Sequence, residues 1–336
     1  MAKNRVKSFL WIDDAPDDRK AQISYISRKL ELGQKILGPN VGASWFDQLM
    51  DEQSSNIDII FVDQNLSNKS NIEAFSAGSS LCSVLKAKYS GVPIIGVSVA
   101  AKTSLSYSQV NEFTDFFELD QLRDKVKSVQ AIVNGFRMLR QKVLVRKREE
   151  KRVLSLLDIP DEDKELMRKI IPSDFLLREP IQIAHDYYKW IRNTLMSYQG
   201  LLINEKELAA SIGLSDEVFS AKIAKNLTAC RYAGIFSEGS NVRYWKSLAI
   251  QELCRMSGGI ETGEKLSRYG LSIVKDEKLL ALCPVCGDKF TEVLAYDEDS
   301  INSIGRSAAH FRCVKEAHIS RPAFFDPIYV LKGASF

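Results

Sequence analysis

The sequence has no long apolar run and very little histidine. No apolar stretch in the 336 residues approaches the ~20 residues of a membrane-spanning helix. The N-terminal "MAKNRVKSF" also lacks the apolar core of a signal peptide. With only three histidines, no Ser/His/Asp or Cys/His arrangement suited to nucleophilic catalysis is visible. We therefore expect a cytoplasmic protein that is not an enzyme acting on a small molecule.

Cysteine and net charge are low as well. Six cysteines are too few for a disulfide scaffold in a chain of this length, which favours a reduced setting with metal binding as the first use to test. The formal net charge of +3 provides no global basic field for nucleic acid, so any basic patch must be local. The length predicts two or three domains with a globular composition.

Residues 1–124 alternate short apolar runs with helical stretches. The runs "SFLWI", "IDIIFVD", "VPIIGVSVA" and "FTDFFEL" predict strands, and "DRKAQISYISRKLEL" and "GSSLCSVLKAKYSG" predict helices. Strands that alternate with helices indicate a doubly wound, flavodoxin-like parallel sheet. Ligands of such sheets bind beyond the carboxyl ends of the strands.

Acidic and hydroxyl side chains stand where three of these strands end. Asp13 and Asp14 follow the first strand, Asp63 ends the next predicted strand, and Ser98 ends the one after it. Their oxygen atoms suit Mg²⁺, which takes a few carboxylates and keeps several waters. A carboxylate beside such a cation is a reasonable nucleophile for a phosphoryl group. The sequence thus predicts a magnesium site made by Asp13, Asp14 and Asp63.

The blocks "FLWIDD", "IIFVDQNL", "PIIGVSVA" and "DFFELDQL" resemble the successive strands of response-regulator receiver domains. The resemblance implies that Asp13 and Asp14 are the acidic pair, Asp63 the phosphoacceptor and Ser98 the hydroxyl after strand four. Gly78 takes the place of the family's loop glycine. The resemblance covers about the first 124 residues and implies two-component signalling in a bacterial cell, with a histidine kinase or another signalling protein as partner.

The sequence departs from the family at strand five. A Lys-Pro pair is usual there, whereas this chain has Leu119 and Asp120. Lys102 and Lys125 are nearby lysines, but neither lies at the family position. Loss of a cation beside a phosphorylated aspartate weakens both transfer and read-out. A working but atypical receiver and a pseudo-receiver that serves as a docking surface are therefore both open.

Residues 125–157 predict a long linker helix, with apolar residues from Val126 to Val143 at helical spacing. Eight Lys or Arg between residues 137 and 152 make it basic. A solvated face is the simplest interpretation, and a homodimerisation helix or a phosphate-contacting arm are the alternatives. The break at Pro160 marks a domain boundary.

Residues 158–256 predict a helical domain. "KELAASIG", a turn at Gly213 and an N-cap at Ser215 have the spacing of a helix-turn-helix, and the segment resembles winged-helix modules. Its second helix has no net charge and offers only Asn226 for base reading, so protein docking is favoured over DNA binding. His185 lies on an amphipathic, aromatic stretch, where a packed or surface histidine is expected rather than a phosphotransfer group.

Residues 257–336 predict a small zinc-stabilised domain. Cys283 and Cys286 form one close pair, and His310 and Cys313 form another. Two such pairs complete a tetrahedral structural Zn²⁺ site, with His318 as the competing fourth ligand. The pattern resembles a zinc ribbon or the first half of a LIM-type finger.

The predicted architecture is thus a multi-domain α/β protein with a receiver-like domain, a linker helix, a winged-helix-like domain and a zinc-ribbon-like domain. We expect it to receive a signal by phosphorylation of Asp63 or by partner docking, and to relay it to the C-terminal domains. The alternatives are a DNA-binding transcriptional regulator, a phosphorelay intermediate or phosphate sink, and a subunit of a bacterial defence complex.

Overall fold

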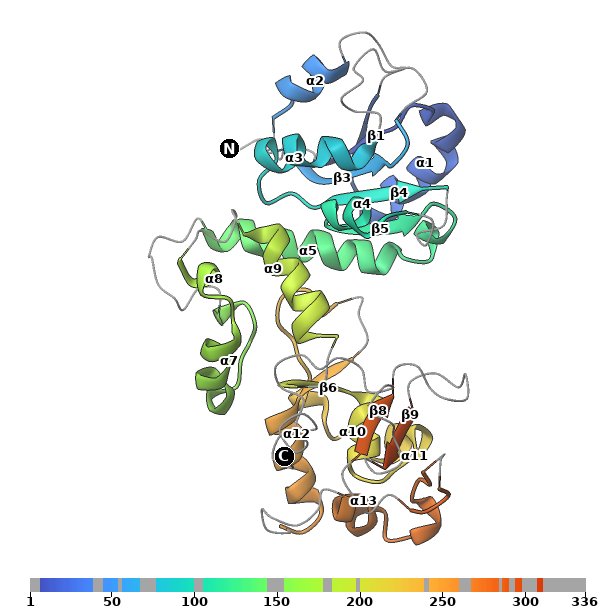
Figure 1. Ribbon diagram of the computed structural model, residues 1–336, viewed down its shortest axis with the longest axis vertical. Helices are drawn as coiled ribbons and strands as arrows, with labels where there is room; N and C mark the ends of the chain where they lie inside the picture. The colour runs from blue at the N-terminus through green and yellow to red at the C-terminus, as the bar shows by residue number, and fades with distance from the viewer. Residues whose placement is uncertain are drawn as a thin grey trace. The chain divides into compact units, whose positions relative to one another are not determined.

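The computed structural model describes residues 7–38, 45–53, 56–66, 77–99, 105–143, 154–177, 183–197, 200–238, 242–259, 267–283, 286–289, 294–297 and 307–310. The chain divides into two compact units (Figure 1). Unit 1 comprises residues 1–156, 172–189 and 238–240, and unit 2 comprises residues 157–171, 190–237 and 241–336. Within the described part of the chain, no helix has the length and apolar character needed to cross a membrane.

Unit 1 is built on a five-stranded parallel sheet. Its strands are β1 (Ser8–Ile12), β2 (Gly33–Leu37), β3 (Ile57–Asp63), β4 (Ile94–Ser98) and β5 (Asp115–Glu118), in the spatial order β2-β1-β3-β4-β5. The doubly wound parallel sheet predicted from the sequence is confirmed, and four of its strands lie where the apolar runs indicated. The strand β2, "GQKIL", was not predicted because it is a partly exposed edge strand in which only Leu37 is buried.

Helices cover both faces of this sheet. They are α1 (Lys20–Leu30), α2 (Trp45–Asp51), α3 (Gly78–Lys88), α4 (Tyr107–Glu112) and α5 (Val126–Val143). Side chains alternate along β1, so Leu10 and Ile12 join a core cluster with Leu81 and Leu85 of α3. On the opposite face, the ring of Trp11 packs against the ring of Phe61, and α5 lies against β3.

Helix α5 is an integral part of unit 1, which differs from the expected linker helix over residues 125–157. Its apolar stripe, represented by Val129, Val133 and Phe136, is fully buried. The stripe is therefore covered within unit 1 and is not the free dimerisation face that we considered. The periodicity correctly indicated an amphipathic helix, but it could not indicate which surface the apolar stripe would contact.

Ionic contacts also fix α5 to the sheet. Asp58, on β3, is fully buried and accepts hydrogen bonds from Arg137 at 2.6 and 2.9 Å and from Arg140 at 2.6 Å. The pairing of β1 with β3 skips Asp58, because Ser8 faces Ile57 while the next residue faces Ile59. This irregularity directs an acidic side chain toward α5 from an otherwise apolar strand.

Two more helices belong to unit 1, α8 (Ser173–Leu177) and α9 (Ala184–Trp190), the latter up to Lys189. Their aromatic side chains are packed, with Phe175 and Tyr187 in edge-to-face contact at 5.6 Å between ring centroids. This segment lies between two parts of unit 2 in the sequence. The sequence placed it in the middle domain, so the division of the chain differs here from the expected boundaries.

Unit 2 is mainly helical and has one continuous core from residue 203 to residue 280. Its helices are α7 (Lys164–Ile170), α10 (Glu205–Ser211), α11 (Asp216–Lys222), α12 (Lys246–Met256) and α13 (Ser267–Val274). Two antiparallel pairs complete it, β6 (Leu202–Asn204) with β7 (Arg243–Trp245), and β8 (Leu294–Asp297) with β9 (Ser307–His310). Because Tyr269 of α13 lies in the shared core, the expected boundary at residue 257 does not separate two cores.

The predicted helix-turn-helix is present as α10 and α11. Gly213 adopts a left-handed backbone with φ of +80° in the turn, and Oγ of Ser215 accepts the backbone N–H of Val218 as an N-cap. A buried ion pair between Glu207 and Arg243, at 3.1 Å, ties α10 to β7. The likeness to a winged helix stays a prediction.

Candidate functional site

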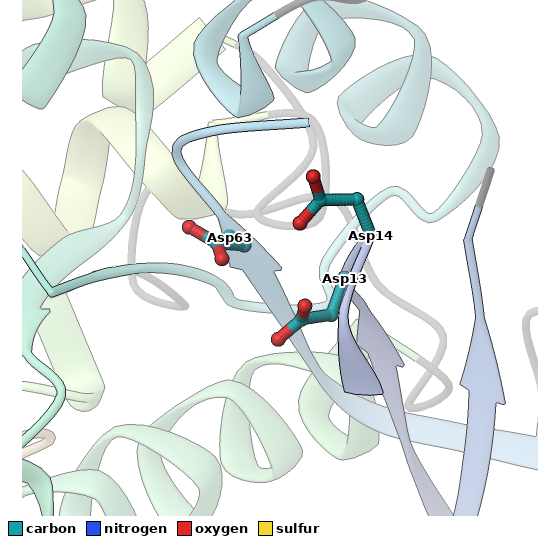
Figure 2. A group of neighbouring side chains, drawn as sticks. All are labelled: Asp13, Asp14 and Asp63. Atoms are coloured by element: carbon teal, nitrogen blue, oxygen red, sulfur yellow. The ribbon is translucent and has the colours of Figure 1, made fainter. Parts of the chain in front are cut away.

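Three aspartates meet at the carboxyl end of the parallel sheet. Asp13 and Asp14 directly follow β1, and Asp63 is the last residue of β3, so adjacent parallel strands deliver all three (Figure 2). One carboxylate oxygen from each residue lies within 4.8 Å of the others. All three side chains are buried. The structure thus brings together the three residues that the sequence predicted as a magnesium site.

The side chain of Asp13 is held in place by two donors. The indole Nε1 of Trp11 donates to Oδ2 at 3.0 Å, and the backbone N–H of Ala15 donates to Oδ1 at 2.7 Å. The second contact folds the chain after β1 into a tight turn that leads into the 3-10 helix Pro16–Arg19. The sequence predicted no role for Trp11 at the site, because it lies within the apolar run "SFLWI".

Two glycines allow the backbone to approach this cluster. A Cβ atom on Gly78, at the start of α3, would lie 2.2 Å from the carbonyl oxygen of Asp63. A Cβ atom on Gly38 would lie 1.9 Å from the carbonyl oxygen of Asp13. Neither position has room for a side chain. The receiver resemblance singled out Gly78, whereas Gly38 was missed.

The surroundings of Asp63 disfavour its ionised form and raise its pKa to about 7. Burial is the largest cause, and the charges of Asp13 and Asp14 contribute to the same rise. The backbone N–H of Asn65, which donates to Oδ1 at 3.1 Å, and the charge of Arg19 act in the opposite direction. The three acids crowd together with more negative charge than their surroundings offset. Such a donor set fits a hard divalent cation.

Ser98 ends β4 beside this cluster. The backbone N–H of Gln64 donates to the carbonyl of Val97 at 2.8 Å, which pairs the ends of β3 and β4. On the other side, Ser98 is in register with Glu118 of β5, and its carbonyl accepts the N–H of Leu119 at 2.8 Å. Ser98 is buried, like the aspartates.

The end of β5 carries no cation among the described residues. Glu118 is its last residue, and Leu119 after it is buried. Lys125 lies beyond the 3-10 helix Gln121–Arg123, and Lys102 lies outside the described residues. In the structure, the residue directly after β5 is thus the apolar Leu119 and not a lysine. Arg19, which the sequence analysis did not consider, is the cation whose charge acts on Asp63.

The predicted zinc ligands are only partly described. Cys283 is buried, Cys286 is exposed, and both are free of disulfides. The backbone N–H of Gly287, the residue after Cys286, donates to the carbonyl of Cys283 at 2.9 Å. His310 is the last residue of β9, while Cys313 and His318 lie outside the described residues.

His185 is a packed residue of α9. It is 9% exposed, its Nδ1 lies 2.8 Å from Oγ1 of Thr114, and burial lowers its pKa to about 3. An enclosed, neutral imidazole of this kind cannot reach a partner protein. Of the two expected placements, packed or at the surface, His185 has the packed one.

Comparisons with known proteins give structural neighbours only. No family model and no curated protein matches the sequence. A receiver protein from Pseudoalteromonas atlantica is 18% identical, with 38% of this chain and 98% of that protein covered and a TM-score of 0.29. A Burkholderia pseudomallei response regulator, solved with a phosphorylated aspartic acid, is 17% identical over 38% of this chain and 71% of its own, with a TM-score of 0.27.

The Salmonella typhimurium response regulator RcsB aligns over 79% of this chain and 98% of its own, at 12% identity and a TM-score of 0.29. These similarities are too low to carry an argument about function. The fold of unit 1 is shown by its own parallel strand order, and the interpretation of the site depends on the three aspartates at its carboxyl end.

Proposed function

We propose that unit 1 is an atypical receiver that binds Mg²⁺ at Asp13, Asp14 and Asp63 and accepts a phosphoryl group on Asp63. The observation that carries this proposal is the meeting of three buried carboxylates, within 4.8 Å of one another, at the carboxyl end of a parallel sheet. Buried like charges favour a bound cation, which also offsets the negative charge of an incoming phosphoryl group.

Each residue of the site has its own role in the proposed phosphoryl transfer. An ionised oxygen of Asp63 attacks phosphorus, a new P–O bond forms, and the bond to the donor's leaving group breaks with its electron pair. Trp11 and the N–H of Ala15 hold Asp13 in a fixed orientation. A bound Mg²⁺ supplies positive charge to the transferred oxygens. Because burial and the charges of Asp13 and Asp14 raise the pKa of Asp63, a bound cation would favour the ionised, reactive carboxylate.

A specific observation favours the second candidate, a pseudo-receiver that works as a docking surface. Glu118, in register with Ser98, places an acidic residue at the end of β5, directly before Leu119, which stands where a lysine would bind the phosphoryl group. Without that lysine, transfer slows. The positive charge of Arg19, which lowers the pKa of Asp63, favours the working receiver instead.

Unit 2 is proposed as the output module of the same signalling protein, acting on a protein rather than on DNA. Its helix-turn-helix carries Asp216 and Glu217 at the start of α11 and Lys222 at its end, which gives little attraction to a phosphate backbone. An affinity for DNA that falls steeply with salt would contradict this assignment.

A structural Zn²⁺ site is proposed at Cys283, Cys286, His310 and Cys313, with His318 as the alternative ligand. The hydrogen bond from Gly287 to the carbonyl of Cys283 supports the first ligand pair, since it holds the residue after Cys286 close to Cys283 and two nearby thiolates suit a tetrahedral ion. Four protein ligands leave no open position, so the metal would stabilise the fold and not catalyse a reaction.

A Mg²⁺ titration tests the proposed receiver site. The indole of Trp11 touches Asp13, so metal binding should alter its fluorescence in the full chain. We expect a saturable change in the wild type that is absent in Asp13→Asn and in Asp63→Asn. Equal responses in all three proteins would exclude this cluster as the binding site, because the other three tryptophans would then be reporting the change.

A further inference from the structure

The helix α9 is held against unit 1 by polar contacts as well as by apolar ones. Nδ1 of His185 lies 2.8 Å from Oγ1 of Thr114, and the hydroxyl of Tyr188 donates to Oδ2 of Asp115 at 2.8 Å. The ring of Phe136, on α5, lies 5.4 Å from the His185 ring and 6.0 Å from the Tyr188 ring. The helix is therefore docked on the start of β5 and on α5.

One polar atom in this contact, Nε2 of His185, has no hydrogen-bond partner among the described residues. His185 is neutral at physiological pH, because burial and then the charges of Lys86 and Lys189 lower its pKa. The Nε2 atom itself is buried. A buried polar atom without a partner reduces the free energy of docking. Two hydrogen bonds thus define the position of α9 on unit 1, while the unpartnered Nε2 atom makes its docking less stable than a fully hydrogen-bonded contact would be.

Strand β4 joins this contact to the aspartate cluster. At the start of β4, the N–H of Ile94 donates to Oγ1 of Thr114 at 2.9 Å, and its carbonyl accepts the N–H of Thr114 at 2.7 Å. At the other end of β4, Val97 is in register with Asp63, and Ser98 after it is in register with Glu118 at the end of β5. The hydroxyl of Thr114 therefore serves both β4 and the imidazole of α9.

Displacement of β4 would disturb the docking of α9. A phosphoryl group on Asp63 would add charged oxygens near the end of β4, and a hydrogen bond to them from the hydroxyl of Ser98 would draw that end of the strand toward Asp63. Because β4 and β5 are paired at both ends, that movement is passed to Thr114. A hydroxyl that must satisfy two partners at 2.8 and 2.9 Å tolerates little displacement.

The helix α9 also depends on its docking for its structure. With the seven residues Ala184–Trp190, it is too short to be stable in water by itself. Its chain leaves unit 1 at Lys189 and enters unit 2 at Trp190, where the π-helical turn Ile191–Leu195 follows. Short π-helical turns often mark functional positions. Release of α9 would therefore free the covalent connection that leads into unit 2.

We propose that α9 is a releasable relay helix, docked through His185 and Tyr188 on Thr114 and Asp115, that couples the aspartate cluster of unit 1 to unit 2. The proposal deepens the proposed function, since phosphorylation of Asp63 is the event that would release the helix. The coupling itself is a property of the β4–β5 pair and is testable without any phosphoryl donor.

Hydrogen–deuterium exchange of the full chain by mass spectrometry tests the coupling. Tyr188→Phe removes the hydrogen bond to Asp115, and we expect the α9 amides to exchange about tenfold faster. Because coupling is reciprocal, the amides of Gln64 and Leu119, which bond to β4 beside the cluster, should also exchange faster. Tyr107→Phe, the same change at an exposed tyrosine of α4, is the matched control and should alter neither segment.

A second arm adds acetyl phosphate and Mg²⁺ to the wild type and follows phosphorylation by intact mass. Labelled protein with faster exchange in α9 supports the relay, whereas labelled protein with unchanged or slower exchange overturns it and leaves the receiver function standing. If the wild type is not labelled, the exchange experiment on Tyr188→Phe tests the relay by itself. Faster exchange of Gln64 and Leu119 in Tyr188→Phe then supports the relay although the receiver function has failed, and unchanged exchange there overturns the relay too.

Discussion

Asp58 and Asp63 lie five residues apart on strand β3, both are buried, and their surroundings shift their pKa in opposite directions. Burial raises the pKa of both carboxyl groups, but the hydrogen bond from Arg137 and the charge of Arg140 outweigh it at Asp58. Asp63 has two acidic neighbours instead of two arginines. One end of β3 is therefore built for stability, and the other end keeps negative charge at a cost in stability.

Asp63→Asn should stabilise the metal-free protein at high pH. Because the pKa of Asp63 is raised to about 7, its ionisation makes the folded state less stable as pH rises from about 4 to about 7. The variant should exceed the wild type in the free energy of unfolding by up to about 4 kcal/mol at pH 8, and by clearly less at pH 5. Urea unfolding at both pH values, with a chelator present, measures the difference.

Asp47→Asn, which removes an exposed carboxyl group outside the aspartate cluster, is the control for that comparison. A gap between Asp63→Asn and wild type of the same size at pH 5 and pH 8 would contradict a raised pKa. Saturating Mg²⁺ should reduce the gap at pH 8, because the cation offsets the repulsion among the three aspartates.

Asp58→Asn should destabilise the protein by about 3 kcal/mol at neutral pH. The substitution leaves Arg137 and Arg140 facing a neutral group in a largely buried contact. Since the pKa of Asp58 is lowered, its contribution is present at neutral pH and is lost as pH falls below about 4. Urea unfolding at pH 7 measures the effect, and a loss no larger than that of Asp47→Asn would show that the cluster contributes little.

Gly78→Ala should lower both stability and Mg²⁺ affinity. The added Cβ would lie 2.2 Å from the carbonyl oxygen of Asp63 and 2.9 Å from the Cγ1 atom of Val62, so the end of β3 must shift. We expect a loss of about 2 kcal/mol or more in the free energy of unfolding. Ser80→Ala, on the same helix, is the control, because Ser80 is exposed and its hydroxyl bonds only locally. Wild-type Mg²⁺ binding in Gly78→Ala would show that the close approach does not matter to the site.

Cys283→Ser should remove bound zinc and lower the thermal stability of unit 2. The purified wild type should contain about one zinc per chain by elemental analysis, since four protein ligands bind one tetrahedral ion. Cys254→Ser, outside the proposed ligand set, is the control and should keep its metal. Full zinc content in Cys283→Ser would remove this residue from the ligands.

The sequence predicted those parts of the molecule that depend on local patterns. Continuous apolar runs indicated the buried strands, and the shared carboxyl ends of parallel strands brought Asp13, Asp14 and Asp63 together. Contacts between residues far apart in the sequence could not be predicted from local patterns. The amphipathic pattern of α5 did not tell a linker from a helix packed on the sheet, and nothing local showed that Asp58 would be paired by Arg137 and Arg140 from 79 and 82 residues away.

Unit 1 also includes a segment that the sequence assigned elsewhere. The aromatic stretch around His185 has an apolar face, but the partner of that face lies on α5 and β5, far away in the sequence. Gly38 and Trp11 were missed at the site for a similar reason. Their importance follows from a close backbone approach and a hydrogen bond, which appear only when the chain is folded.

Phosphoryl transfer to Asp63 is the central claim, and incorporation of phosphate from acetyl phosphate tests it most directly. Wild type, Asp63→Asn and Ser98→Ala are incubated with acetyl phosphate, each with Mg²⁺ and with a chelator, and the added mass is located by peptide mapping. We predict Mg²⁺-dependent labelling of Asp63 in the wild type, none in Asp63→Asn, and slower labelling in Ser98→Ala. Wild-type protein that stays unlabelled, or label that persists in Asp63→Asn, would contradict the assignment of Asp63 as the phosphoacceptor.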